Sequence, residues 1–163
     1  MGELSSGVIA FKEWDVICEA LEDGRQSVIL RKGGIHEGRE GFSFAHEEFV
    51  LFPTRFHAQG EFVTVPGVTA KPEWEIGEEV VITIRVKVTK AVTLTDWEEV
   101  AKLSDQHIWK EDVIRDRFFW EGKGMASGSI HVAYVRVEKL DEPIRFEYTK
   151  KYGGCRSWVE LHV

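Results

Sequence analysis

The sequence predicts an α+β fold: a mainly antiparallel sheet, strongly twisted or barrel-like, with two to three helices. Over residues 80–89 a β-branched residue occupies every second position, the period of a strand with one buried face. Over residues 10–22 apolar side chains recur at spacings of three and four, the period of a helix. The elements do not follow regular βαβ spacing, which favours antiparallel pairing.

Residues 10–22 are predicted to form the first helix, because their apolar spacing stops at Gly24, a residue that commonly ends helices. The next apolar run, residues 27–32, is predicted to form a strand. This strand enters a turn at Gly33 and Gly34.

A second short strand is predicted over residues 49–52. It is expected to end at Pro53, because proline has no N–H for the sheet ladder. Residues 60–75 contain several proline and glycine breakers and are expected to be irregular. The strand over residues 80–89 then continues past Ala91 with a bend.

A capping box at residues 95–98 opens a short helix that is predicted to run through Leu103. Ser104 is expected to cap a further helical stretch over residues 109–118, with its apolar side chains inward.

Residues 121–129 are predicted to form a glycine-rich loop, followed by a long strand over residues 130–140. Pro143 is expected to break this strand, which resumes over residues 144–149. In order and type, these elements resemble the barrels of PUA-like RNA- and base-binding domains, a likeness of fold alone.

Length and composition fit a single globular domain over residues 1–163, with a disordered leader at residues 1–8. No signal peptide and no run of eighteen apolar residues is visible, which predicts a cytoplasmic protein without a membrane span. The net charge of −7 disfavours a protein that coats nucleic acid through overall charge, but it allows a local basic patch. Cys18 and Cys155 form no CxxC pattern, and no HxH or HExxH occurs, so neither a metal nor a cofactor is predicted.

Two glycine pairs beside cations are the strongest candidates for a binding site. Gly33 and Gly34 follow Arg31 and Lys32. Paired glycines let the backbone turn with positive φ and approach a ligand closely, and neighbouring cations favour an anion. The pattern is not a P-loop, because no GxxxxGK[ST] occurs. One interpretation is a phosphate or carboxylate held by backbone N–H groups and these cations; the alternative is a strand-ending turn with solvated charges.

The second pair opens the segment Gly153-Gly154-Cys155-Arg156-Ser157-Trp158. Both pairs lie in stretches with four cations and one acid, residues 25–39 and 144–158, each with a local charge of +3. Cys155 beside Arg156 is also a candidate nucleophile, with His57 or His107 as its base. The alternative is an inert cysteine.

Two further groups are candidate ligand contacts. Thr54 and His57 could donate to a ligand oxygen, or they are ordinary loop residues. Around His107, one interpretation has Trp109 stacking on a base and Arg117 contacting a phosphate. The alternative places Trp109 in the core and pairs the arginine with neighbouring acids.

Five motifs occur in order along the chain: Ala10-Phe11-Lys12-Glu13-Trp14, Leu30-Arg31-Lys32-Gly33-Gly34-Ile35, Phe52-Pro53-Thr54 with His57, His107-Ile108-Trp109 with Arg115 and Arg117, and Tyr152-Gly153-Gly154-Cys155-Arg156-Ser157-Trp158. This ordered set closely resembles a bacterial family, common in cyanobacteria, that is classified as a domain of unknown function. The resemblance covers residues 10–161. It implies no catalytic residues, and it implies an association of relatives with restriction-endonuclease-type domains in nucleic-acid-related defence.

The leading hypothesis from the sequence is a non-enzymatic domain that binds a nucleic acid or a nucleotide-like anion. One alternative is a small metal-independent hydrolase or nuclease-system enzyme that uses Cys155 or a histidine. Another is an interaction module that docks a partner protein through its aromatic side chains.

Overall fold

Six strands form one mixed sheet in the order β2-β5-β4-β3-β1-β6. The computed structural model describes residues 7–32, 44–119 and 128–162. The strands are β1 (Val8–Trp14), β2 (Val28–Lys32), β3 (Glu48–Thr54), β4 (Glu79–Leu94), β5 (Ile130–Glu147) and β6 (Trp158–Leu161). Neighbouring strands are antiparallel except β1 and β3, which are parallel. The predicted α+β, mainly antiparallel fold is confirmed; within the described residues the sheet stays open, with β2 and β6 at its edges.

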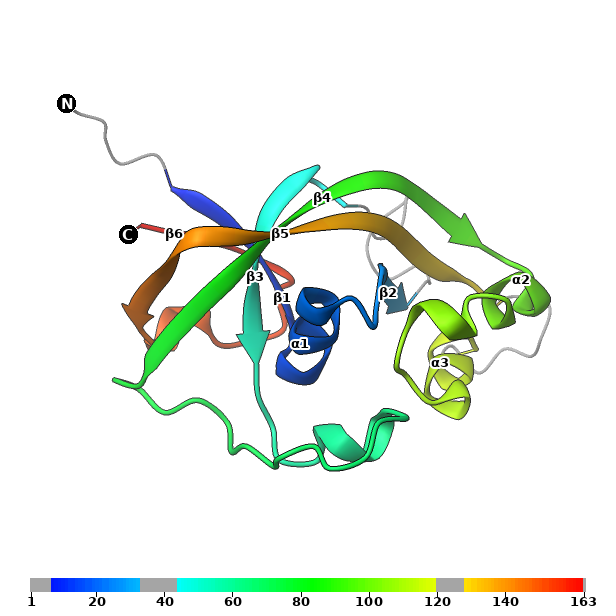
Figure 1. Ribbon diagram of the computed structural model, residues 1–163, viewed down its shortest axis with the longest axis horizontal. Helices are drawn as coiled ribbons and strands as arrows, with labels where there is room; N and C mark the ends of the chain where they lie inside the picture. Colours follow the sequence, from blue (N-terminus) through cyan, green and yellow to red (C-terminus); the bar gives the residue numbers. More distant parts are fainter. Residues whose placement is uncertain (1–6, 33–43, 120–127, 163) are drawn as a thin grey trace.

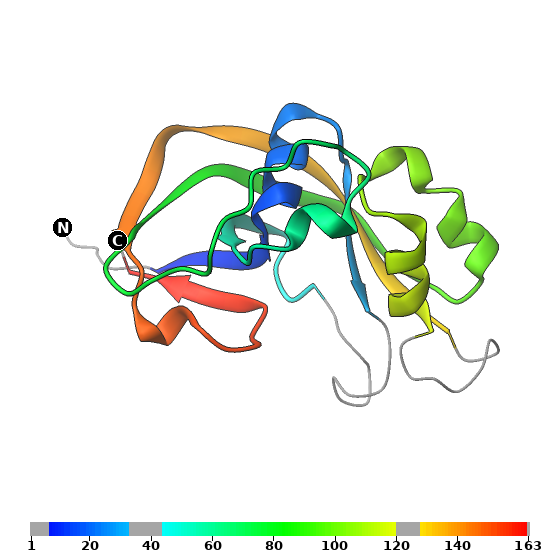
Figure 2. The same cartoon turned by 90° about the horizontal axis from the view of Figure 1, so that it is seen from below.

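The helices are α1 (Asp15–Asp23), α2 (Trp97–Ala101) and α3 (Glu111–Phe118), with short 3₁₀ turns η1 (Gln59–Phe62), η2 (Ser104–Gln106) and η4 (Lys150–Tyr152). Figure 1 shows β4 and β5 side by side as long curved ribbons, with α1 inside the curve and α2 and α3 at one end. Figure 2 shows β6 and the start of β1 at the opposite end. None of the helices described is long and apolar enough to cross a membrane.

The predicted helix over residues 10–22 is wrong in its first half. Residues Val8–Trp14 form β1, which lies between β3 and β6, and α1 begins only at Asp15. Phe11 fits the helical spacing of the apolar residues, yet it is fully buried in the strand. Pairing with two strands distant in sequence therefore overrides the local spacing. The predicted helix end is confirmed, because Gly24 has φ +89°, a left-handed conformation that favours glycine.

Two prolines do not end strands where the sequence predicts. β3 continues through Pro53, which pairs with Glu13 in the parallel ladder. The edge of Pro53 away from β1 has no strand partner, and its carbonyl accepts a hydrogen bond from Trp74 Nε1 at 2.8 Å. β5 likewise continues through Pro143. That proline lies in a bulge, where the register shifts between Ile82 and Ile84 of β4.

The predicted helix starts in the C-terminal half of the chain also need correction. Asp96 is the N-cap of α2, and its side chain accepts a hydrogen bond from the Glu98 N–H at 3.0 Å. The helix predicted over residues 109–118 begins only at Glu111, because Trp109 is held in an isolated β-bridge with Val63. Ser104 lies in a 3₁₀ turn and does not cap this helix.

β6 was not predicted, because its four residues are too short for a clear alternation. The predicted leader over residues 1–8 and glycine-rich loop over residues 121–129 lie largely outside the described residues.

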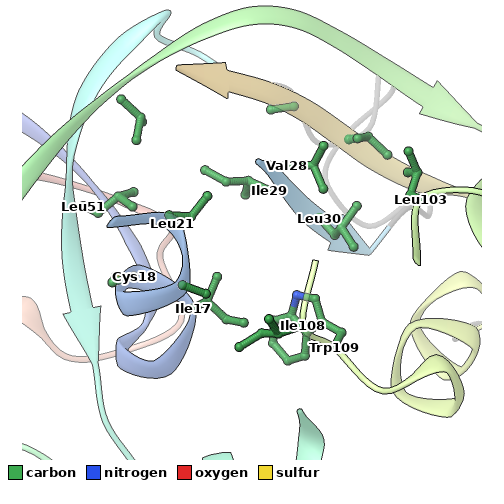
Figure 3. Close-up of a cluster of buried hydrophobic side chains, with 14 of the residues drawn as sticks. Ile17, Cys18, Leu21, Val28, Ile29, Leu30, Leu51, Leu103, Ile108 and Trp109 are labelled. Atoms are coloured by element: carbon green, nitrogen blue, oxygen red, sulfur yellow. The ribbon is translucent and has the colours of Figure 1, made fainter. Parts of the chain in front are cut away.

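The main core lies between the curved sheet and the helices. Figure 3 shows side chains from α1, β2 and β3 converging with Ile108 and Trp109. On α3, Ile114 and Phe118 are buried in the same cluster, which holds this helix beside the end of β2. This packing brings α3 and β2 together although they are far apart in the sequence.

Candidate functional site

A pocket of about 360 Å³ lies where the ends of β1 and β2 meet α3. Arg31 and Lys32 come from the end of β2, Trp14 from the end of β1, and Asp116 and Arg117 from α3. Three of these five side chains are cations and one is an acid. The pocket therefore combines positive charge with an aromatic ring, as a site for an anionic ligand requires.

Arg31 is held in place by β1. Its Nη2 donates to the Lys12 carbonyl, and its Nη1 lies 3.4 Å from both carboxylate oxygens of Glu13. Its guanidinium also lies over the Phe11 ring, 4.4 Å from the centroid. These contacts orient the arginine before any ligand arrives.

Glu13 is a buried carboxylate, with only 1% of its surface exposed. Besides Arg31, it accepts a hydrogen bond from the Trp14 N–H at 2.9 Å. It is also close enough to Arg117 to oppose the lowering of that residue's pKa. A single buried acid thus faces two arginines.

Arg117 lies over two tryptophan rings, 4.1 Å from the centroid of Trp109 and 5.3 Å from that of Trp14. In the described part of the chain it forms no ion pair and no hydrogen bond. Burial lowers its pKa, the Arg31 charge lowers it further, and Glu13 only partly opposes both effects. The guanidinium donors are therefore available to an anion.

His107 and Trp109 are both buried. Trp109 is 2% exposed, so its ring is not a surface on which a base could stack. His107 Nδ1 accepts a hydrogen bond from the Trp109 N–H at 3.1 Å, and burial lowers the pKa of His107 to about 4. His107 is therefore neutral near pH 7 and fixes the backbone beside Trp109.

Thr54 and His57 are not among the side chains that line this pocket. Thr54 ends β3, pairs with Trp14, and its carbonyl accepts a hydrogen bond from Gln59 Nε2 at 2.8 Å. His57 is exposed in the following turn.

The second glycine pair lies beside Lys12 of β1. The Gly154 carbonyl accepts a hydrogen bond from Lys12 Nζ at 3.3 Å, and the Ser157 carbonyl accepts one from the Lys12 N–H at 2.8 Å. Trp158 packs its ring on Phe11, with centroids 4.7 Å apart. Gly33 and Gly34 lie outside the described residues, so of the first glycine motif only Arg31 and Lys32 are described.

Cys155 is exposed, and no hydrogen bond joins it to a histidine in the described part of the chain. Arg156 donates to the Lys151 carbonyl at 2.5 Å. No group of three or more metal-ligating side chains occurs among the described residues.

Of the predicted site residues, the fold brings Arg31, Lys32 and Arg117 together. The sequence analysis missed Glu13 and Trp14 as site residues because it placed them on a helix. A usable signal was present, since Lys12 and Glu13 are adjacent charged residues inside an apolar run, and that run forms a buried strand.

The family described as Domain of unknown function (DUF1802) matches residues 10–163. The chain belongs to this family. The resemblance inferred from the five ordered motifs is thereby confirmed over nearly the whole chain. A comparison of this DUF1802 protein with curated proteins finds no match.

Among solved structures, the ASCH protein of Zymomonas mobilis is similar, with a TM-score of 0.54 and 12% identity over 94% of this chain and 86% of that chain. A serine-to-alanine mutant of the same protein has a TM-score of 0.54 and 10% identity over 94% and 87%. At such identities the likeness shows the fold alone. The DUF1802 chain thus has an ASCH-like, PUA-like architecture, as its order of elements indicated.

Proposed function

We propose that this protein binds a nucleic acid or a nucleotide-like anion in the pocket between β2 and α3. The observation that carries the proposal is the state of Arg117. Its guanidinium lines the pocket, is stacked on Trp109, and has no acidic partner within ion-pairing distance among the described residues. A phosphate group would supply the missing counter-charge and accept charge-assisted hydrogen bonds from it.

Arg31 supports the same ligand class. Its contacts with Lys12 and Glu13 preorganise it at the mouth of the pocket, so little side-chain entropy is lost on binding. The half-buried Trp14 adds an apolar edge against which a base or ribose could pack. Because the whole chain carries a charge of −7, we expect binding at this local pocket and not along an extended basic surface.

The hydrolase alternative would need a base beside Cys155. His107 does not suit this role, because it is buried and its Nδ1 already accepts a hydrogen bond from the Trp109 N–H.

The alternative of a protein-docking module differs from our proposal in its salt dependence. Docking through aromatic side chains is weakly sensitive to salt, whereas phosphate binding is strongly sensitive.

The test is a tryptophan-fluorescence titration with short single- and double-stranded oligonucleotides and with nucleoside monophosphates, at two salt concentrations. Arg117 lies on two of the six tryptophans, so a bound phosphate should change their emission. We expect binding that weakens with salt. We also expect Arg117→Gln to lower the affinity and to reduce the salt slope by about 0.7 for a single strand.

Arg115→Gln is the matched control, because Arg115 lies on the same helix but over Trp97, away from the pocket. The proposal is wrong if no oligonucleotide or nucleotide binds at low salt, or if both variants lose affinity equally. Salt-insensitive binding of a partner protein that survives Arg117→Gln would favour the docking module.

A further inference from the structure

Lys12 is a buried lysine on β1, the strand next to the edge strand β6, with only 8% of its surface exposed. Its ammonium has three donors, and one hydrogen bond is present, to the Gly154 carbonyl at 3.3 Å. Lysine is seldom this buried unless an acid accompanies it. Burying an ammonium that lacks a counter-charge is unfavourable.

No such acid lies beside Lys12 in the part of the chain that the structure describes. A second cation, Arg156, is close enough to act on Lys12 electrostatically. Burial lowers the pKa of Lys12, Arg156 lowers it further, and only Cys155 opposes them. Lys12 and Arg156 therefore lie at the same glycine turn, and among the described residues neither forms an ion pair with a carboxylate.

We infer that Lys12 and Arg156 form a second anion site, distinct from the pocket at Arg117, that binds a phosphate group at the Gly153–Gly154 turn. A phosphate presents several acceptor oxygens, so it can satisfy the remaining Lys12 donors and the Arg156 guanidinium together.

The turn is built for a close approach. Gly154 has φ +92°, and a side chain there would be strained, which keeps the backbone beside Lys12 bare. The Arg156 guanidinium donates a hydrogen bond to the Lys151 carbonyl at 2.5 Å, which holds the rest of the turn in place. The Lys12 N–H is bonded to Ser157, so the strand and the turn move as one unit.

The two sites lie on opposite faces of β1. Phe11 and Glu13 carry the contacts to Arg31, whereas Lys12 lies between them in a strand whose side chains alternate. The phosphate could come from free inorganic phosphate or from the backbone of a nucleic acid. In the second case one strand could reach both sites across the edge of β1, past Trp158, the first residue of β6, which pairs with Phe11.

Thermal unfolding of the full chain tests the inference, with potassium phosphate as one probe and a single-stranded oligonucleotide as the other. We expect phosphate to raise the Tm of the wild-type protein by roughly 5–10 °C at about 100 times Kd. Lys12→Met keeps the length of the side chain and removes its charge. It should have an unliganded Tm at least as high as wild type, and it should lose the phosphate response.

Lys139→Met is the matched control, because Lys139 is exposed on β5 and the charge change is the same. If only the oligonucleotide raises the Tm and Lys12→Met reduces that effect, the phosphate is that of a nucleic-acid backbone. Should Lys12→Met fail to fold, Arg156→Gln at the exposed end of the turn must show the same loss.

The inference is wrong if wild type responds to neither probe, or if Lys12→Met keeps the wild-type response. It is also wrong if the phosphate response disappears in Arg117→Gln and persists in Lys12→Met. That last result would leave the proposed function intact and place the only phosphate in the β2–α3 pocket.

Discussion

Glu13→Gln should lower stability and raise anion affinity at the same time. Removing one partner of a buried ion pair costs about 3–5 kcal/mol when the other charge is left buried. Here the cost is smaller, because the Arg31 side chain is 21% exposed and the glutamine amide still accepts from the Trp14 N–H. We expect a loss of about 2 kcal/mol in the free energy of unfolding, or roughly 4–8 °C in Tm for a chain of this size.

Binding should change in the opposite direction. Glu13 lies 3.4 Å from Arg31 Nη1, on the protein side of the guanidinium. An anion on the outer side would lie about 7 Å from the carboxylate, where Coulomb repulsion is about 1–2 kcal/mol at an effective dielectric of about 25–45, between that of a protein surface and that of water. Without that charge, affinity for a phosphate-bearing ligand should rise by roughly five- to thirtyfold.

Urea unfolding gives the stability change, and the fluorescence titration gives the affinity. Glu142→Gln serves as the control, because Glu142 is exposed on β5 and its replacement changes the net charge equally. A variant that is less stable and also binds more weakly would refute the reasoning, since Glu13 would then serve the ligand and not oppose it. Equal gains in affinity for both variants would show that net charge alone is responsible.

The remaining predictions concern pH, backbone and thiols. Burial lowers the pKa of His107 from 6.5 to about 4, and the unfolded chain therefore takes up its proton first as the pH falls. Stability should be lost between about pH 6.5 and pH 4, by at most about 3 kcal/mol from this group, and His107→Asn should flatten that part of the urea-unfolding profile. Gly154→Ala should destabilise by about 1–2 kcal/mol because of its left-handed φ of +92°, whereas Gly153→Ala, at φ −78°, should cost less than about 0.5 kcal/mol in the same assay. A thiol reagent should modify the exposed Cys155 at once and the buried Cys18, whose pKa is raised by burial, only on unfolding.

The elements predicted correctly are those whose signals lie within a few residues. The alternation over residues 80–89 marks β4, because a long strand with one buried face repeats that pattern whatever its partners are. The Gly24 helix end depends on backbone conformation at one position. The family resemblance also follows from short motifs in order.

The elements predicted wrongly depend on partners distant in sequence. Residues Val8–Trp14 are a strand because β3 and β6 pair with them on both sides. Pro143 is tolerated because a bulge opposite β4 takes it out of the ladder. Neither the pairing of β1 nor the bulge at Pro143 can be recognised from the residues next to it in the sequence.

By itself, then, the sequence determined the fold class, the family and the cationic residues that could meet an anion. Only the tertiary structure decided which of them meet. Arg31 and Arg117 are far apart in the sequence, and packing of α3 against the end of β2 brings them to one pocket, where the nearby Glu13 carboxylate acts on both. Lys12 is a candidate anion-binding residue only because the structure buries it with no acid as a partner. The sequence does not show this, since charge pairing depends on distance in space and not on distance along the chain.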